Sequence, residues 1–149
     1  MDATPQTPHC KRLTMKEEDY LETILNVSAE KGYAKTRDVA DELDLSPPSV
    51  VEMFAKLDHK KLVVYRKYEG VTLTDAGRAV AEQIKYRHDV LVEFLRLIAV
   101  PDQIAEKDAC FMEHELNAAT IQKIKQFVEY VGSTKSAHAE LKRFTEFCK

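Results

Sequence analysis

One short segment, residues 44–50, constrains the fold of this chain more than any other, because it specifies a tight turn that leads directly into a helix. The segment reads Asp-Leu-Ser-Pro-Pro-Ser-Val. Ser46 is a favourable N-cap, and Pro47 suits the first helical position, where a backbone N–H is not needed. Apolar residues recur at helical spacing on both sides of the segment, and Thr36 is expected to cap the helix that precedes it. We therefore predict a helix-turn-helix whose second helix runs from residue 47 to about residue 61.

Two β-forming runs follow the helix-turn-helix. Val63–Arg66 and Val71–Leu73 are rich in β-branched residues, and Gly70 lies in the turn between them. A hairpin in this position is a wing. The sequence therefore predicts a winged-helix DNA-binding domain over residues 14–75.

Helical patterns account for the rest of the chain. Thr14 and Glu17 predict a capping box at the start of the first helix, and Gly32 is expected to end that helix. Beyond the hairpin, apolar residues recur at helical spacing in segments that begin near positions 75, 102, 118 and 133. Residues 76–149 are thus predicted to form an all-helical dimerisation and metal-binding domain, because their apolar positions exceed what a small bundle can bury alone. The expected fold class is mostly α, and residues 1–13 are expected to be a disordered tail.

Basic residues are concentrated beside the predicted recognition helix, although the chain has a formal net charge of −3. Between positions 56 and 67, Asp58 is the only acidic residue among five lysines and arginines. Basic side chains neutralise phosphates, whereas side chains at the start of a recognition helix reach base edges. The predicted partner is double-stranded operator DNA. The predicted DNA-binding residues are Thr36, Arg37, Ser46, Pro47, Pro48, Ser49, Glu52, Lys56, Lys60, Arg66 and Lys67.

The chain is expected to be cytoplasmic and to have no contact with a membrane. Its first residues contain no apolar stretch that resembles a secretory signal, and no apolar run approaches the roughly 20 residues that a membrane span requires. The three cysteines are odd in number and widely spaced, which argues against a disulfide framework. Cys10 and Cys148 are expected to be free thiols.

Three separated segments carry side chains of the types that bind metal ions. Two carboxylates lie three residues apart on the first predicted helix, so both point the same way. A Cys-x-x-Glu-His pattern places three donors on one face of a later helix, and a histidine lies on the long helix between them. Together these donors suffice for one or two divalent first-row ions. The predicted metal ligands are Asp19, Glu22, His88, Cys110, Glu113 and His114.

Over residues 15–131 the chain also resembles the diphtheria-toxin-repressor family of metal-dependent regulators, particularly its manganese-transport-regulator branch. The motifs that carry the resemblance include Glu18-Asp19-Tyr20-Leu21-Glu22, Lys31-Gly32-Tyr33-Ala34, Ser46-Pro47-Pro48-Ser49-Val50, Tyr86-Arg87-His88 and Glu113-His114. The resemblance implies a homodimeric transcriptional repressor that controls metal-ion uptake and is not an enzyme. It also implies that Glu22 and Glu113 are shared between two neighbouring ions. The third, SH3-like domain of longer family members is not expected here.

The predicted metal site combines features of two branches of this family. Manganese-type members have a glutamate at the position of Cys110. Iron-type members have a cysteine there but a methionine at the position of Asp19. A thiolate is soft and favours Fe(II), Co(II) or Zn(II), whereas a carboxylate suits harder ions such as Mn(II). Mn(II) or Fe(II) is the expected cofactor, with Zn(II) or Co(II) as alternatives.

The expected ligands come from both predicted domains, so a bound ion is expected to join the domains. It would thereby favour the dimer whose recognition helices lie about 34 Å apart and fit successive major grooves. Two alternatives stay open at this point. One is a winged-helix regulator that senses a small organic ligand or thiol oxidation. The other is a metal-dependent hydrolase, although the sequence contains no Gly-rich phosphate loop or nucleophile elbow.

Overall fold

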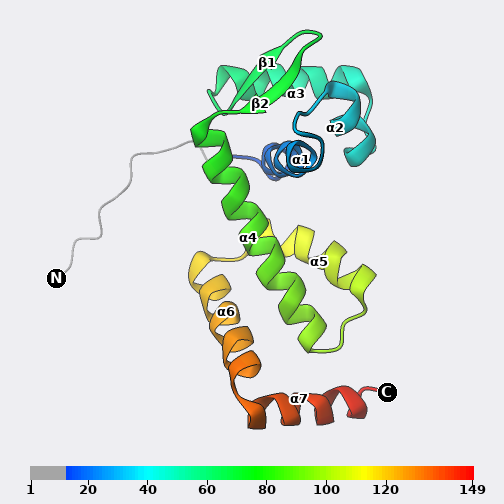
Figure 1. The fold of residues 1–149 in the computed structure, drawn as a ribbon, viewed down its shortest axis with the longest axis vertical. Coiled ribbons are helices and arrows are strands. Elements are labelled where there is room, and N and C mark those ends of the chain that lie inside the picture. The colour runs from blue at the N-terminus through cyan, green and yellow to red at the C-terminus, as the bar shows by residue number, and fades with distance from the viewer. Residues whose placement is uncertain (1–12) are drawn as a thin grey trace, which may run out of the picture. The chain divides into compact units, whose positions relative to one another are not determined.

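The computed structural model describes residues 13–149 and divides the chain into two compact units, one ending at Gly77 and the other beginning at Arg78 (Figure 1). Cys10 and nearly all of the predicted tail therefore lie outside the described residues. The elements are α1 Met15–Lys31, α2 Thr36–Leu43, α3 Pro47–His59, β1 Val63–Arg66, β2 Gly70–Leu73, α4 Asp75–Leu97, α5 Asp102–Glu115, α6 Ala118–Ser133 and α7 Lys135–Phe147. The prediction of a mostly α protein with a β-hairpin wing is confirmed.

Helix α1 begins and ends as its sequence predicts. The Thr14 hydroxyl accepts a hydrogen bond from the Glu17 N–H at 3.2 Å, and the Glu17 carboxylate accepts one from the Thr14 N–H at 2.9 Å. This reciprocal capping box satisfies two backbone donors that a helix start would otherwise leave without partners. At the other end, Gly32 adopts the left-handed conformation with φ 78° and closes the helix.

The start of α2 differs from the prediction by one position. Lys35 is the N-cap, and Thr36 is the first helical residue. The cause is Asp38, whose carboxylate accepts a hydrogen bond from the Lys35 N–H at 3.1 Å and pairs with Lys31 at 2.6 Å. A carboxylate reaching back from the third position caps the helix start in place of the Thr36 hydroxyl.

The recognition helix α3 begins where the Ser-Pro-Pro-Ser segment predicts. Ser46 is the N-cap, and Pro47 occupies the first helical position. The Ser46 hydroxyl lies 2.9 Å from the Ser49 hydroxyl rather than bonding to a backbone N–H. The helix ends at His59, two residues before the predicted end.

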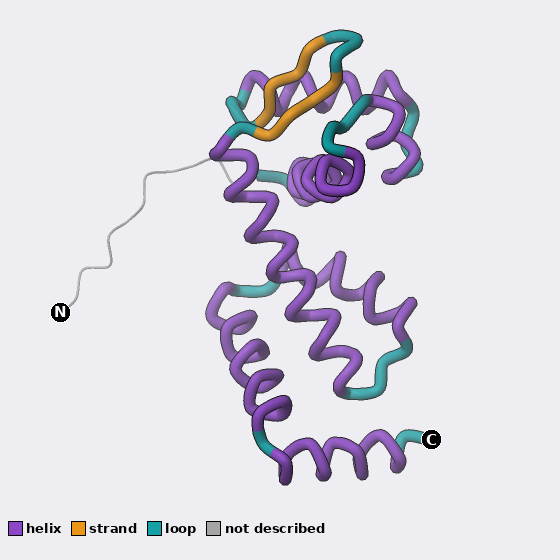
Figure 2. Tube along the Cα trace, viewed as in Figure 1, coloured by secondary structure: helices purple, strands orange, loops and turns teal. Residues whose placement is uncertain are grey.

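The wing is an antiparallel hairpin that is also tied to the segment after α1. Val63 pairs with Leu73, and Arg66 pairs with Gly70 (Figure 2). Next to the hairpin, the N–H of Val71 donates a hydrogen bond to the Ala34 carbonyl at 2.9 Å. A side chain at Gly70, which has φ 117°, would collide with that carbonyl. Glycine is therefore required at this close approach of two backbone segments.

Aromatic packing holds α1, α3 and the wing together in the first unit. Phe54 of α3 is fully buried. Its ring lies edge-on to Tyr20 of α1 at 6.4 Å and lies 5.4 Å from the ring of Tyr65 in β1. Because interiors are close-packed, these contacts fix the recognition helix against both neighbours.

A buried carboxylate provides a second tie between α1 and α3. The side chain of Glu17 is 0% exposed, and its Oε1 atom lies 2.7 Å from the Lys60 ammonium and 3.1 Å from the Lys56 ammonium. Burial by itself raises the pKa of Glu17, but hydrogen bonds from Lys60, the Thr14 N–H and Lys56 outweigh burial and lower the pKa to about 2. Glu17 thus stays ionised in the folded protein and holds the C-terminal half of α3.

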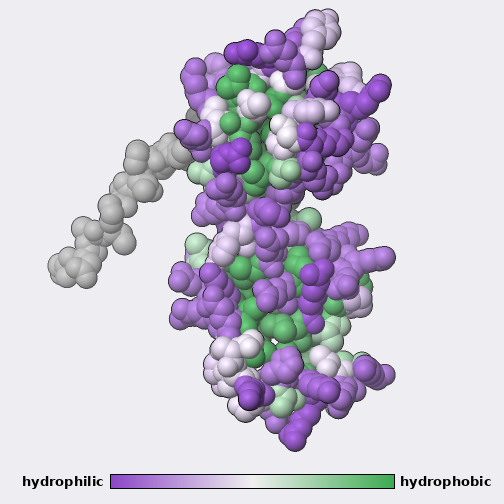
Figure 3. Space-filling view, viewed as in Figure 1, coloured by the Kyte–Doolittle hydropathy of each residue, from purple (hydrophilic) through white to green (hydrophobic). Residues whose placement is uncertain are grey.

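The second unit is helical, and α4, α5 and α6 supply its apolar core. None of the side chains of α7 is buried, and Phe147 is 87% exposed. Apolar side chains are visible in both units, surrounded by hydrophilic residues (Figure 3). Among the described residues, no helix is long and apolar enough to span a membrane. The buried core residues are Val90, Leu91, Val92, Leu95, Ala105, Ala109 and Ile121.

The Glu17 contacts predict how stability depends on pH. Since the folded pKa of about 2 lies below the ordinary value of 4.5, the ionised carboxylate stabilises the fold above about pH 4.5. This contribution is lost as the pH falls towards 2, and it amounts to about 3 kcal/mol. We expect Glu17→Gln to lower the free energy of unfolding by that order at pH 7 and by much less at pH 3, as measured by urea unfolding.

Glu30→Gln is the matched control, because Glu30 is an exposed residue on the same helix. It should leave the stability nearly unchanged at both pH values. An equal loss of stability for Glu17→Gln at pH 7 and pH 3 would contradict the role assigned to the ionised carboxylate.

Candidate metal centre and nucleic-acid interface

Four of the predicted metal ligands lie in the second unit, on two helices. His88 lies on α4, and Cys110, Glu113 and His114 lie on α5. Glu113 and His114 are buried, with 1% and 7% of their surfaces exposed, whereas Cys110 is exposed. The helical spacing of three and four residues places the α5 donors on neighbouring positions of one face, as the sequence predicts.

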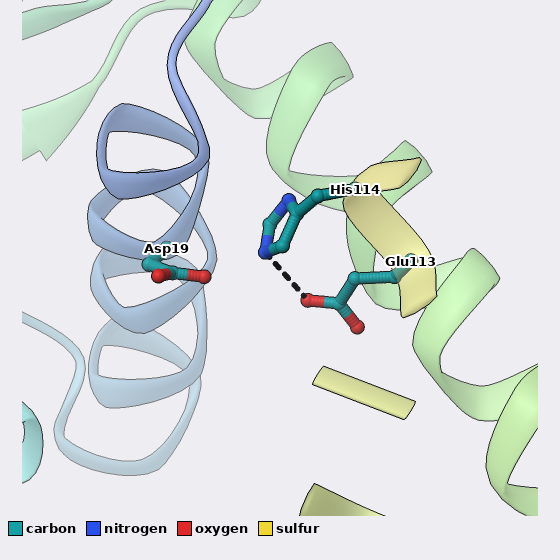
Figure 4. A group of neighbouring side chains, drawn as sticks. All are labelled: Asp19, Glu113 and His114. Atoms are coloured by element: carbon teal, nitrogen blue, oxygen red, sulfur yellow. Dashed lines mark ion pairs between the residues drawn. The ribbon is translucent and has the colours of Figure 1, made fainter. Parts of the chain in front are cut away.

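The structure brings these four side chains together around the Glu113 carboxylate. Its Oε2 atom lies 2.7 Å from Nδ1 of His88, and its Oε1 atom lies 3.4 Å from Nε2 of His114. The Cys110 sulfur lies 3.7 Å from the same Nδ1 atom of His88. Figure 4 shows Glu113 and His114 at consecutive positions of α5, with their ion pair dashed.

In this cluster, the Glu113 carboxylate is the group whose burial a bound cation would stabilise most. Its carboxylate is fully buried, yet within the described part of the chain Oε1 has no hydrogen-bond partner. A buried carboxylate oxygen without a hydrogen bond is costly, and most such groups in proteins are paired or coordinate a metal. A divalent transition-metal ion therefore fits a donor set of carboxylate, imidazole and thiolate groups at this point.

His88 carries the charge that partly balances Glu113 when no metal is bound. The hydrogen bond to Cys110 and that to Glu113 raise the pKa of His88, burial opposes them, and Glu106 adds to the rise, giving a value of about 11. The ring is then an imidazolium at neutral pH. Since a metal ligand must be a neutral imidazole, an ion that binds here displaces a proton from His88.

Glu106 belongs to the same cluster but is absent from the predicted ligands. Its Oε2 atom lies 2.9 Å from Nε2 of His88, and its Oε1 atom lies 3.0 Å from the Arg96 guanidinium. A usable signal was present in the sequence, because Glu106 precedes Cys110 by four residues and Glu113 by seven. That spacing places all three on one helical face.

The remaining two predicted metal ligands lie in the first unit. Asp19 and Glu22 are three residues apart on α1, and both are half-buried. Asp19 is labelled on α1 in Figure 4. Their shared face agrees with the helical spacing on which the prediction rests.

The predicted base-reading residues form an exposed surface at the start of α3. Residues 46–49 and Glu52 are all exposed. Thr36 is half-buried and Arg37 is exposed at the start of α2. Exposed hydroxyl groups at the N-terminal end of a recognition helix can bond to base edges or to phosphates.

Two of the predicted phosphate contacts already have partners in the protein. The ammonium groups of Lys56 and Lys60 contact Glu17, and their side chains are 53% and 30% exposed. An ammonium group has three donors, so each lysine keeps donors beyond the one that Glu17 engages. This pairing was not predicted, because Glu17 and Lys60 lie 43 residues apart and the local sequence of Glu17 indicates only a capping box.

The wing presents the remaining basic residues. Arg66 lies 3.5 Å from Glu69, and both side chains are exposed. The Lys67 ammonium lies 5.2 Å from the ring centroid of Tyr68, which is 88% exposed. Tyr68 was not among the predicted contacts, although an aromatic residue in a polar turn between Lys67 and Glu69 was visible in the sequence.

Comparisons with known proteins match both units. The family model described as "Iron dependent repressor, N-terminal DNA binding domain" matches residues 12–71. The model described as "Iron dependent repressor, metal binding and dimerisation domain" matches residues 74–140. These descriptions agree with the separate placement of the exposed helix-turn-helix and the Glu113 cluster.

Individual relatives match most of the chain. The HTH-type transcriptional regulator MntR of Bacillus velezensis is 38% identical over 129 residues, which are 87% of this chain and 91% of that protein. MntR of Geobacillus kaustophilus is 41% identical over 117 residues, which are 78% of this chain and 83% of that protein. The structure of the manganese regulator SloR aligns with a TM-score of 0.68 and 26% identity over 79% of this chain. This chain spans only 55% of the SloR structure.

The position of Cys110 leads to a prediction about metal preference. Cys110→Glu replaces a soft sulfur with a harder oxygen donor at an exposed position. We expect the ratio of Co(II) to Mn(II) affinity to fall by about tenfold or more, equivalent to about 1.4 kcal/mol. Separate titrations with Mn(II) and Co(II) measure the ratio, and the sulfur-to-cobalt charge-transfer band should disappear.

Cys148→Ser removes the other exposed thiol and serves as the control. It should keep both the metal ranking and the charge-transfer band. An unchanged ranking in Cys110→Glu would show that the Cys110 sulfur does not bind the ion.

Proposed function

Because this chain belongs to the iron-dependent repressor family of metal-dependent transcriptional regulators, we propose that it is a homodimeric repressor that binds operator DNA when a divalent metal ion is bound. Family membership confirms three predictions: the chain is a DNA-binding regulator, it depends on a metal ion, and it is not an enzyme. Neither alternative from the sequence, a hydrolase or a sensor of organic ligands, is supported by these relatives. Control of metal-ion uptake remains part of the proposal.

The observation that supports the proposal most strongly is the cluster around Glu113. A buried carboxylate oxygen without a hydrogen-bond partner lies among two imidazoles and a thiol. A buried carboxylate oxygen without a hydrogen bond is costly, and a bound cation would remove that cost. The same unit matches the family's metal-binding model.

We propose that Asp19 and Glu22 complete the ligand set and that one or two ions bind per subunit. The support is chemical: both are carboxylates on one face of α1, and both match the family motif. Mn(II) or Fe(II) is the proposed cofactor, with Zn(II) or Co(II) as further candidates because Cys110 offers a soft donor. The complete proposed set is Asp19, Glu22, His88, Cys110, Glu113 and His114.

The proposed DNA contacts begin with the exposed start of α3. Residues 46–49 and Glu52 would face base edges, and Arg37, Arg66 and Lys67 would face phosphates. Thr36 lies at the start of α2 and is proposed to bond to the DNA backbone. Lys56 and Lys60 would use the donors that Glu17 does not engage. Since chromosomal DNA is the proposed partner, we place the protein in the cytoplasm.

The homodimer is proposed to form through the second unit. This unit matches the family's dimerisation model, and it exposes large apolar side chains on its last two helices. Tyr130 of α6 is 58% exposed, and Phe144 of α7 is 42% exposed. Two paired subunits would present their recognition helices to successive major grooves about 34 Å apart.

The proposal predicts that DNA affinity depends on the metal ion. Operator fragments selected from genomic DNA would be titrated with protein at one salt concentration, in the presence of Mn(II), Fe(II), Zn(II) or a chelator. We expect at least one ion to raise the affinity by about 5- to 150-fold, the usual range of allosteric coupling. Glu113→Gln should lose most of this increase, because the buried carboxylate no longer carries a charge.

Glu115→Gln is the control, because Glu115 is an exposed residue on the same helix. It should retain the full effect of the metal ion. Equal DNA affinity with chelator and with every ion would rule out metal-dependent repression.

A further inference from the structure

We propose that Glu106 is a positioning residue of the metal site, which holds the orientation of the His88 ring and accepts the hydrogen on its Nε2 atom. This inference rests on the proposed function, because it assigns a role in binding the same metal ion. Its basis is that the two nitrogens of the His88 ring face different partners. Glu106 is not among the predicted metal ligands.

The two sides of the His88 ring differ in chemistry. Nδ1 lies 2.7 Å from the Glu113 carboxylate and 3.7 Å from the Cys110 sulfur, so this nitrogen belongs to the donor cluster. Nε2 lies 2.9 Å from the Glu106 carboxylate instead. The side chain of His88 is only 15% exposed, so few other partners can replace these.

Glu106 matches the form of His88 that binds an ion through Nδ1. A neutral imidazole has one N–H and one lone pair, and an ionised carboxylate can only accept a hydrogen bond. When an ion takes the lone pair of Nδ1, the remaining hydrogen lies on Nε2, where Glu106 is placed to accept it. This is the form of His88 that can bind an ion within the cluster. A carboxylate bonded to the second nitrogen of a ligating histidine also raises the basicity of the ligand.

Glu106 is itself held in place by a network on the outer side of the ring. Its Oε1 atom accepts a hydrogen bond from Arg96 at 3.0 Å, so each carboxylate oxygen has one partner. Arg96 in turn donates from Nε to Asp102 at 2.9 Å. His88 and Arg96 lie on α4 and Glu106 lies on α5, so the network also joins the two helices of the site.

The geometry favours a positioning role over direct ligation. An ion bound at Nδ1 lies on the side of the ring that faces Glu113, whereas Glu106 contacts the nitrogen on the other side. Both oxygens of Glu106 are already engaged, by His88 and by Arg96. The carboxylate is half-exposed.

The test compares two substitutions of Glu106 in the full chain. Glu106→Leu removes the acceptor, whereas Glu106→Gln keeps one oxygen that can accept from Nε2. Co(II) alone is titrated into each protein and followed by visible absorption. We expect Glu106→Leu to bind Co(II) about 10- to 100-fold more weakly, the range typical for loss of such a partner, and Glu106→Gln to recover part of the loss.

A spectroscopic measurement separates positioning from a merely structural role. In the Zn(II)-loaded protein, long-range ¹H–¹⁵N spectra should show His88 with its hydrogen on Nε2 in the wild type and in Glu106→Gln. In Glu106→Leu the Nε2–H signal should move upfield and exchange faster with water, because its acceptor is gone. Asp102→Asn is the control, because it removes the charge of the other carboxylate beside Arg96 without touching His88, and it should keep both the affinity and the signal.

Three outcomes would overturn the inference. Wild-type Co(II) affinity in Glu106→Leu would show that His88 needs no outer partner. A changed cobalt coordination spectrum in Glu106→Gln would show that Glu106 binds the ion directly. Failure of the wild type itself to bind Co(II) or Zn(II) would contradict the proposed function as well as this inference. The first two outcomes would contradict only the inference about Glu106. Equal thermal unfolding of the metal-free variants establishes that each substitution leaves the fold intact.

Discussion

Charge burial is the physical constraint on which the functional features of both units depend. The chain buries two carboxylates almost completely, Glu17 in the first unit and Glu113 in the second. Glu17 has internal partners, because Lys56, Lys60 and the Thr14 N–H surround it. Glu113 has an imidazole at each oxygen but keeps one oxygen without a hydrogen bond. A buried carboxylate needs opposite charge beside it. Glu17 finds that charge on α3 and so ties two helices together, whereas Glu113 favours the binding of a cation.

The first unit connects its proposed metal-binding residues to its DNA-reading helix through a single rigid element. Asp19 lies two residues after Glu17 on α1, and Glu17 holds the lysines of α3. Tyr20, one turn after Glu17 on α1, packs against Phe54 of α3. A constraint applied to α1 is thus transmitted to α3, because packed interiors resist local deformation. No separate signalling element is needed within this unit.

Local features of the fold were predictable from the sequence, and non-local pairings were not. The capping box, the Ser-Pro helix start and the hairpin depend on residues close in sequence, and all were predicted. Thr36 was wrongly predicted as a cap because the Asp38 carboxylate accepts a hydrogen bond from the Lys35 N–H, which places the N-cap one residue earlier. The Glu17–Lys60 pair spans 43 residues, so charge patterning alone assigned the lysine to DNA. The metal donors of α5 followed from helical spacing, whereas the pairing of Glu106 with His88 spans 18 residues and was missed.

The hybrid donor set can be understood from which groups are buried and which are exposed. Glu113 and His114 are buried and so form the fixed part of the proposed site, whereas Cys110 is exposed one turn earlier on the same helix. A buried ligand determines whether a cation binds at all, because its desolvation makes an empty site costly. An exposed ligand can change between sulfur and oxygen without disturbing the core, and so it tunes which ion is preferred. In the proposed ligand set, metal dependence therefore rests on the buried Glu113, and metal preference on the exposed Cys110 of the same helix, where a substitution would change the preferred ion while Glu113, His88 and His114 stay the same.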